Sequence, residues 1–470
     1  MTAVLGRGAP SEAPGAPSPR TGPAGTLRTH GGGAALFLGV ASFFLLSMRQ
    51  TFSVPGTFGM SLAQSLFAGA ALLWVFTIIT RHAEPIRDRV VLIVVLAYVT
   101  ASFLSFGASM MRGVPYVAQV ALDRYILVDL CLLGMVLFIL TVVRSTDAYR
   151  TIIGAIVLGG TASAGFALVM VSTGIDLAAD FRIPGLKAND YVIVKNLLRE
   201  GISRPQGSAG HPLELSAVLT VVLPLALALV FEARRRRSST QWLWAGCTAV
   251  LMAGALVTVS RSAVVGTAAA VLVMCWRWPI RRIAVLVVVG GGAVGIGLAL
   301  QMKFMTAMLQ TFQGVVSDSS IKSRQIGLDY AATHFWEHPW LGQGVGAYPA
   351  LKQPVLDNQY VSRLMEAGVI GLLAFVAALA AALFMAVRTS AARERSVAEL
   401  GGGVAGSLAA VIIISLILDT AGFAQIWYLT WILVALAGVG HRLARDGEGF
   451  GPITTTGAGI PPRAVRASGT

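Results

Sequence analysis

Charged residues are scarce in this chain: they make up 12% of its 470 residues, whereas hydrophobic residues make up 55%. Soluble domains carry about 25% charged residues. The mean hydropathy is high, at +0.73, and apolar runs of roughly 20 residues, the length that crosses a bilayer, recur along the chain. The shortage of charge excludes an ordinary soluble globular protein and predicts an all-α polytopic membrane protein.

Cysteine and lysine are also rare. Cys131, Cys247 and Cys275 lie in apolar stretches without the spacing of a metal site, so we expect no disulfide, no metal and no cofactor. Only 5 lysines accompany 31 arginines. The net charge of +14 does not imply a nucleic-acid partner, because most arginines lie between apolar runs, as they do in membrane proteins.

Twelve apolar stretches each approach the length of one membrane span. They are 34–50, 58–80, 88–110, 123–143, 151–173, 212–232, 241–259, 262–277, 281–301, 361–387, 401–420 and 424–441. The first residues are rich in Pro, Gly, Ala and Ser, which is typical of disorder. We therefore predict a disordered cytoplasmic tail at 1–33, a transmembrane domain at 34–445 and a second disordered cytoplasmic tail at 446–470.

Arginines alternate between the two sides of these spans. Five short loops hold Arg81, Arg87, Arg89, Arg144, Arg150, Arg234, Arg235, Arg236, Arg237, Arg277, Arg281, Arg282, Arg388, Arg393 and Arg395. The alternate short loops hold only Arg49, Arg112, Arg124 and Arg261. The positive-inside rule therefore predicts cytoplasmic termini and two long extracytoplasmic connections, 174–211 and 302–360. The run 234–237 is expected to mark topology and to contact anionic lipid.

Arg261 lies at a break between two apolar stretches, 241–259 and 262–277. A charge inside a membrane segment costs roughly 2.5–3.5 kcal/mol on insertion scales, and it persists mainly where it has a use or a partner. Arg261 could bind an anion at one face of the bilayer. It could instead cap the preceding helix or contact lipid headgroups.

The two long connections carry the polar motifs. The first ends in Arg204-Pro-Gln-Gly-Ser-Ala-Gly-His211-Pro212. The second contains Ser323-Arg324 and then His338-Pro-Trp-Leu-Gly-Gln-Gly-Val-Gly346. It closes with Asp357-Asn358-Gln-Tyr360, which Glu366, Gly368 and Gly371 follow.

In these motifs the chain resembles the O-antigen ligase and O-antigen polymerase superfamily, which are polytopic bacterial glycosyltransferases. The matching features, in order, are Arg204 with His211, Ser260-Arg261, Arg324, His338–Gly346, and Asn358 followed after nine residues by Gly368 and Gly371. The resemblance implies a GT-C-like fold in a bacterial inner or plasma membrane. It also implies a polyprenyl-diphosphate-linked glycan donor, a glycan or lipid acceptor, and membrane lipids as partners.

The resemblance assigns Arg261, Arg324 and Asp357 to catalysis, without a metal. It assigns substrate binding to Arg204, His211, Asn358, Tyr360 and Glu366. Asp357 stands where the family has the histidine thought to activate the acceptor hydroxyl, so it could be the base, or it could be the N-cap of the next helix. Glu366 could bind substrate or pair with Arg363.

The residue types fit this chemistry independently. Breaking a sugar–diphosphate bond builds negative charge on the diphosphate, and guanidinium groups stabilise that charge with bidentate geometry. The sequence leaves open whether the product is a polymer or a ligated glycan. A lipid-linked glycan flippase or polysaccharide transporter is the alternative, although we find no repeat between the two halves of the chain.

Overall fold

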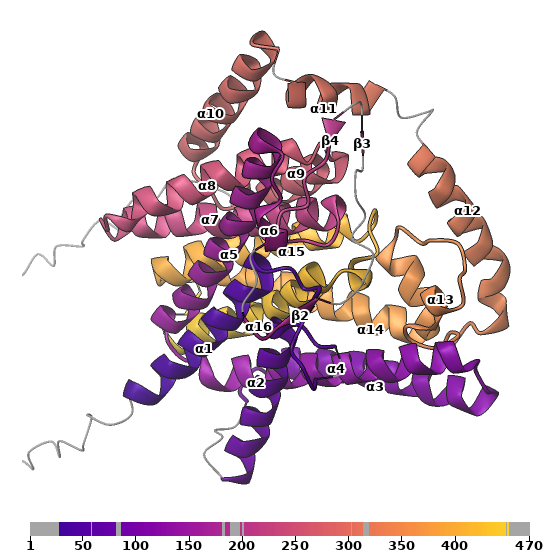
Figure 1. Cartoon of the computed structure of the whole chain (residues 1–470). Helices are drawn as coiled ribbons and strands as arrows, with labels where there is room; N and C mark the ends of the chain where they lie inside the picture. The colour runs from indigo at the N-terminus through magenta and orange to yellow at the C-terminus, as the bar shows by residue number, and fades with distance from the viewer. Residues whose placement is uncertain are drawn as a thin grey trace, which may run out of the picture.

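The computed structural model describes residues 28–57, 59–80, 86–180, 184–188, 198–199, 202–301, 303–313, 319–447 and 449–450. Most of the two predicted tails lies outside the described residues. Within the described part, the strands are two-residue pairs, β1 (Phe52–Ser53) with β2 (Lys187–Ala188) and β3 (Leu198–Arg199) with β4 (Ile202–Ser203). Helices make up nearly all of the remaining regular structure (Figure 1), which confirms the predicted fold class.

Each predicted span is a helix. The twelve are α1 (Arg28–Ser47), α2 (Leu62–Ile79), α3 (Arg89–Arg112), α4 (Tyr116–Val142), α5 (Thr146–Thr173), α7 (Pro212–Arg235), α8 (Thr240–Val257), α9 (Arg261–Cys275), α10 (Ile280–Ala299), α14 (Gln359–Thr389), α15 (Arg395–Ile414) and α16 (Ala424–Asp446). Among the described residues, nine of these are long and apolar enough to cross a membrane; α1, α8 and α9 are apolar but shorter. Several predicted boundaries were wrong by up to seven residues: α4 begins at Tyr116 rather than at 123, and α15 spans Arg395–Ile414 rather than 401–420.

Helix α16 lies at the centre of the bundle (Figure 1), in contact with α14, α15 and α4. Its Trp427 and Trp431 are each 2% exposed and pack against Tyr98 of α3. Helix α15 approaches α7 closely, since a Cβ on Gly403 would lie 2.5 Å from the Cβ of Ala228. Small residues permit such an approach between membrane helices. These contacts hold α16 against α3 and α15 against α7.

Both long connections lie at one end of the bundle, here named the loop end. The first contains α6 (Leu177–Asp180) and β2 to β4, and the second contains α11 (Lys303–Gln313), α12 (Ser319–His334), η2 (Phe335–Glu337) and α13 (Ala347–Ala350). Arginines tie both connections to the helices. Arg49 is 2% exposed, pairs with Asp176 at 2.6 Å and donates to the carbonyl of Gly207 at 3.2 Å. Arg112 donates to the carbonyl of Gly342 at 2.7 Å.

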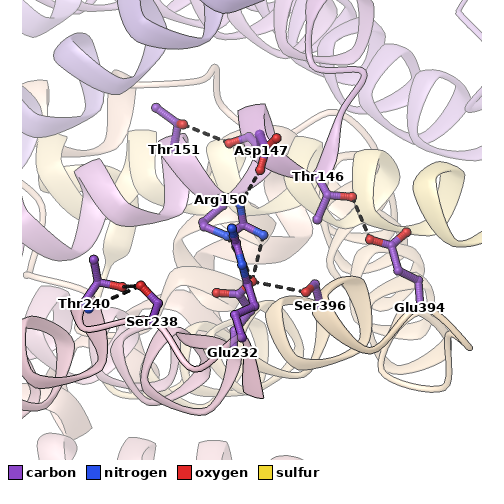
Figure 2. Close-up of polar contacts among 10 residues, drawn as sticks. Thr146, Asp147, Arg150, Thr151, Glu232, Ser238, Thr240, Glu394 and Ser396 are labelled. Carbon is purple, nitrogen blue, oxygen red and sulfur yellow. Dashed lines mark hydrogen bonds and ion pairs between the residues drawn. The ribbon is translucent and has the colours of Figure 1, made fainter. Parts of the chain in front are cut away.

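The opposite end, here named the arginine end, is held by buried carboxylates. Glu232 of α7 is 2% exposed and accepts hydrogen bonds from Arg150 of α5, at 2.7 Å, and from Ser396 of α15, at 3.2 Å (Figure 2). Beside it, Thr146 donates to Glu394 at 3.0 Å. These contacts join the start of α5 and the start of α15 to the end of α7.

The arginine run 234–237 takes part in this network. Arg236 lies 3.6 Å from Glu232, and Arg235 pairs with Glu399 of α15 at 2.6 Å. The expectation that the run serves only topology and lipid contact was therefore incomplete. Arg235 also ties the end of α7 to α15, and Arg236 pairs within the last turn of α7.

The glycine-rich segment 338–346 docks on a kink in α14. The kink is at Gly368, whose φ of 65° interrupts the helix. The N–H of Gly344 donates to the carbonyl of Glu366 at 2.9 Å. A Cβ on Gly368 would lie 2.2 Å from the carbonyl carbon of Trp340. Only glycine fits both this φ and this spacing, so the motif sets how the second connection sits on the bundle.

We expect Gly368→Ala to destabilise the protein by about 1–3 kcal/mol, because alanine is strained at this φ and its methyl would strike main chain. Thermal unfolding of the detergent-purified protein would measure this as a lower Tm. The control is Gly246→Ala in α8, where a Cβ would meet nothing within 4 Å. Equal Tm values for the two variants would contradict the role assigned to the kink.

Candidate functional site

The segment 415–423, here named the α15–α16 connection, contacts several of the predicted site elements at the loop end. It contains η3 (Thr420–Gly422). Gln359, the first residue of α14, donates its N–H to the carbonyl of Ser415 at 2.8 Å. Its side-chain oxygen accepts hydrogen bonds from the hydroxyl of Thr420, at 3.0 Å, and from the N–H of Ala421, at 2.5 Å. The start of α14 is therefore fixed on this connection.

Arg324 and Asp357, two of the predicted catalytic residues, meet beside the α15–α16 connection. Arg324 lies on α12, which contacts α14. Its Nε is 3.4 Å from Oδ2 of Asp357, and its Nη2 donates to the carbonyl of Ile417 at 3.2 Å. The two side chains are 31% and 25% exposed, so both remain within reach of a ligand.

The N-cap of α14 is Asn358, not Asp357. Oδ1 of Asn358 accepts the N–H groups of Tyr360, at 2.9 Å, and Val361, at 3.2 Å. The alternative in which Asp357 caps the helix is therefore wrong, and the Asp357 carboxylate is left to pair with Arg324. The hydroxyl of Tyr360 donates to the carbonyl of Ile412 at 3.0 Å, which anchors the first turn of α14 to α15.

Arg204 and Arg261 come together at the turn between α8 and α9. Arg204 is 8% exposed, and its Nε donates to the carbonyl of Thr258 at 2.8 Å. Val259 follows with a φ of 46°, an uncommon value for a β-branched residue. The tight turn lets α9 begin at Arg261, whose side chain is half-buried. Arg204 thus bonds to the turn that precedes Arg261, although the two arginines come from distant segments of the chain.

His211 is the N-cap of α7. Its Nδ1 accepts the N–H of Leu213 at 3.1 Å, which requires an unprotonated nitrogen at that position. Burial and the neighbouring Arg204 guanidinium lower the pKa of His211 to about 4. The imidazole is therefore neutral near pH 7. Its ring lies 5.9 Å from that of Phe423, so the α15–α16 connection also reaches this part of the site.

Glu366 is more deeply buried than Arg324 and Asp357, since it is only 3% exposed. Its Oε1 accepts the N–H of Gly346 at 3.1 Å, and its main-chain carbonyl accepts the hydroxyl of Ser105 at 2.8 Å. It therefore holds the glycine-rich segment against α3 and α14. Its substrate-binding role stays a prediction, as do the roles of the other site residues.

Sequence reasoning gave little weight to Arg363, which is fully buried. Its guanidinium donates to the hydroxyl of Tyr98 and lies 5.8 Å from the ring centroid of Trp427. Nε and Nη1 have no hydrogen-bond partner among the described residues. The suggested pairing with Glu366 is thus not a hydrogen-bonded contact. The sequence signal was present, since an arginine inside a membrane helix marks a polar interior.

Asp419 is a further acidic residue at the loop end, and no role was predicted for it from the sequence. It lies in the α15–α16 connection, where Oδ2 accepts the hydroxyl of Ser362 at 3.3 Å. Burial raises the pKa of Asp419 to about 6. It therefore adds a second carboxyl group beside the first turn of α14.

Within the described part of the chain, no group of three His, Cys, Asp or Glu residues is arranged to hold a metal ion. Residues 246–376 match the family model described as O-antigen ligase. The match runs from α8 into α14, so it includes Arg261, Arg324 and Asp357 and leaves out Arg204 and His211. A search among curated proteins finds no match.

The depressed pKa of His211 predicts a loss of stability in acid. The unfolded histidine binds a proton below about 6.5, whereas the folded one resists protonation until about pH 4. The contribution of the neutral His211 to folding stability is therefore complete above about pH 6.5 and is lost as the pH falls toward 4. His211→Asn keeps a capping oxygen but does not titrate. We expect the Tm of the wild type to fall more steeply than that of this variant between pH 7 and 4; parallel curves would contradict the assignment.

Proposed function

The chain belongs to the O-antigen ligase superfamily, and from that premise we propose that it transfers a glycan from a polyprenyl diphosphate to an acceptor hydroxyl. The observation that supports this most directly is the pairing of Arg324 with Asp357 at 3.4 Å. It places a guanidinium group, which can bind a diphosphate, next to a carboxylate, which can accept a proton. The product would be a polymerised or ligated surface polysaccharide.

Arg204, Arg261 and Arg324 would bind the diphosphate. Arg204 and Arg261 lie at the α8–α9 turn, and Arg324 lies by the α15–α16 connection. Guanidinium groups present a planar pair of donors that fits phosphate oxygens, and they stabilise the negative charge that grows as the sugar–phosphate bond breaks. The neutral imidazole of His211 stands next to Arg204 and could donate a hydrogen bond without adding charge.

Asp357 would accept the proton of the acceptor hydroxyl. The acceptor oxygen then bonds to the anomeric carbon, and the bond from that carbon to the diphosphate breaks with its electron pair going to the phosphate oxygen. Asn358 and Tyr360 lie directly beyond Asp357 and would contact the acceptor glycan. Glu366 would contribute by holding the glycine-rich segment, through its bond to Gly346.

The loop end would face outward from a bacterial inner or plasma membrane. The alternating arginines support this, since the arginine end carries most of the positive charge. The donor's polyprenyl chain would then lie in the outer leaflet, with its diphosphate at the loop end. Membrane lipids would surround the apolar helices, of which α10 and α2 are the least buried.

The direct test is transfer by the purified protein in proteoliposomes. A radiolabelled polyprenyl-diphosphate glycan should be consumed, with the label appearing on an acceptor, and product size would separate polymerisation from ligation. Arg261→Lys keeps the charge but loses the planar fork, so we expect activity to fall roughly 10- to 100-fold. Arg89→Lys, at the exposed start of α3, is the control. Movement of the donor across the bilayer without transfer would favour a flippase instead.

The orientation predicts which positions react with an impermeant maleimide. In a variant without Cys131, Cys247 and Cys275, Thr333→Cys on α12 should react in intact cells whose outer barrier is permeable. Ser239→Cys, between α7 and α8, should react only after lysis. Both positions are exposed, so accessibility within the fold does not limit either reaction. The reverse pattern would place the loop end in the cytoplasm and remove the basis for an outward-facing site.

A further inference from the structure

We infer that Asp357 has a second role, in donor binding: it competes with the diphosphate for Arg324, so that donor binding releases the carboxylate that activates the acceptor. This rests on the proposed function, because it takes Arg324 as a diphosphate ligand. It goes beyond that function by coupling the two halves of the site. The donor would bind first, and the acceptor would be activated only afterwards.

The geometry makes the competition direct. Nε of Arg324 lies 3.4 Å from Oδ2 of Asp357 in an ion pair without a hydrogen bond, and Nη2 donates to the carbonyl of Ile417. A carboxylate therefore lies beside the edge of the guanidinium that a diphosphate would need for bidentate binding. The hydrogen bond to Ile417 fixes the position of Arg324 on the α15–α16 connection. The guanidinium can therefore exchange the Asp357 carboxylate for a diphosphate without moving far.

The magnitudes favour the diphosphate. An ion pair between partly exposed side chains, here 31% and 25% exposed, stabilises by about 0.2–1 kcal/mol at most sites. A bidentate guanidinium–phosphate contact is charge-assisted on both bonds and is stronger. The Arg324–Asp357 pair is thus strong enough to form before the donor binds and weak enough for the donor to displace it.

The same competition would complete the cycle. During transfer Asp357 takes the proton of the acceptor hydroxyl, and the diphosphate leaves with the electron pair of the broken bond. Once Asp357 has released that proton to water, its carboxylate can compete for Arg324 again, which lowers the affinity of the site for the spent polyprenyl diphosphate. Asp357 would therefore act both in the chemical step and in release of the product.

The alternative is a purely structural role, in which Asp357 and Arg324 form a surface ion pair that only holds α12 against α14. The two ideas differ in the effect of Asp357→Asn on diphosphate affinity. If the pair is only structural, loss of the carboxylate loosens α12 and weakens binding or leaves it unchanged. If it competes, loss of the carboxylate frees Arg324 and strengthens binding.

The experiment measures binding of undecaprenyl diphosphate, without sugar, to the full-length protein in nanodiscs. We expect Asp357→Asn to bind it about two- to fivefold more tightly than the wild type, which is the range that one exposed ion pair would supply. The same variant should lose transfer activity by roughly 10²–10⁴-fold if Asp357 is the base. Tighter binding with lost turnover is an outcome that a structural pair does not produce.

Asp329→Asn is the matched control. Asp329 is exposed on α12, the helix that carries Arg324, and it accepts a hydrogen bond from Gln325 at 2.9 Å. The variant therefore removes one negative charge from this helix without removing a partner of Arg324. It should leave affinity unchanged. Equal tightening in both variants would mean a general charge effect, and unchanged or weaker binding by Asp357→Asn would mean a structural pair; either result overturns the inference. If even the wild type does not bind the diphosphate, the proposed function itself fails.

Discussion

The hydrogen bonds of Gln359 are the interaction on which the geometry of the site depends. Its main chain and side chain together hold the start of α14 on the α15–α16 connection. Because Gln359 is fully buried, losing these bonds would leave unsatisfied polar groups in an apolar interior. The position of Asp357, two residues earlier, follows from this anchor. So does the pairing of Asp357 with Arg324, which itself bonds to the same connection.

Arginines at both ends of the bundle have ordered partners. At the arginine end they pair with carboxylates such as the buried Glu232 and the partly buried Glu399, which offset their charge. At the loop end, Arg112 and Arg204 donate to main-chain carbonyls. A carbonyl fixes the direction of a guanidinium without cancelling its charge. Arg112 and Arg204 therefore keep their positive charge at the loop end, which is consistent with the proposed anionic donor.

Hydropathy and arginine spacing predicted the helices because each depends only on local composition. The same reasoning assigned 415–420 to a span, since Ser-Leu-Ile-Leu-Asp-Thr is too apolar to be read as a turn. Asp357 and Asn358 are equally good N-caps, so only the structure distinguishes the cap from its neighbour. The contact of Arg204 with Thr258 joins positions 54 residues apart, and no sequence period indicates such a meeting.

Helix direction adds to the preference for an anion at the loop end. Helices α7, α9, α14 and α16 all begin there, and a helix N-terminus carries a partial positive charge of about half a unit. His211 caps the first of these helices and Asn358 the third, while Arg261 begins the second. Each N-terminus favours a nearby anion by about 0.3–1 kcal/mol, and the neutral imidazole of His211 preserves that effect. In the proposed function, specificity for a diphosphate would then come from the arginines, because dipoles attract any anion whereas paired guanidinium groups select by shape.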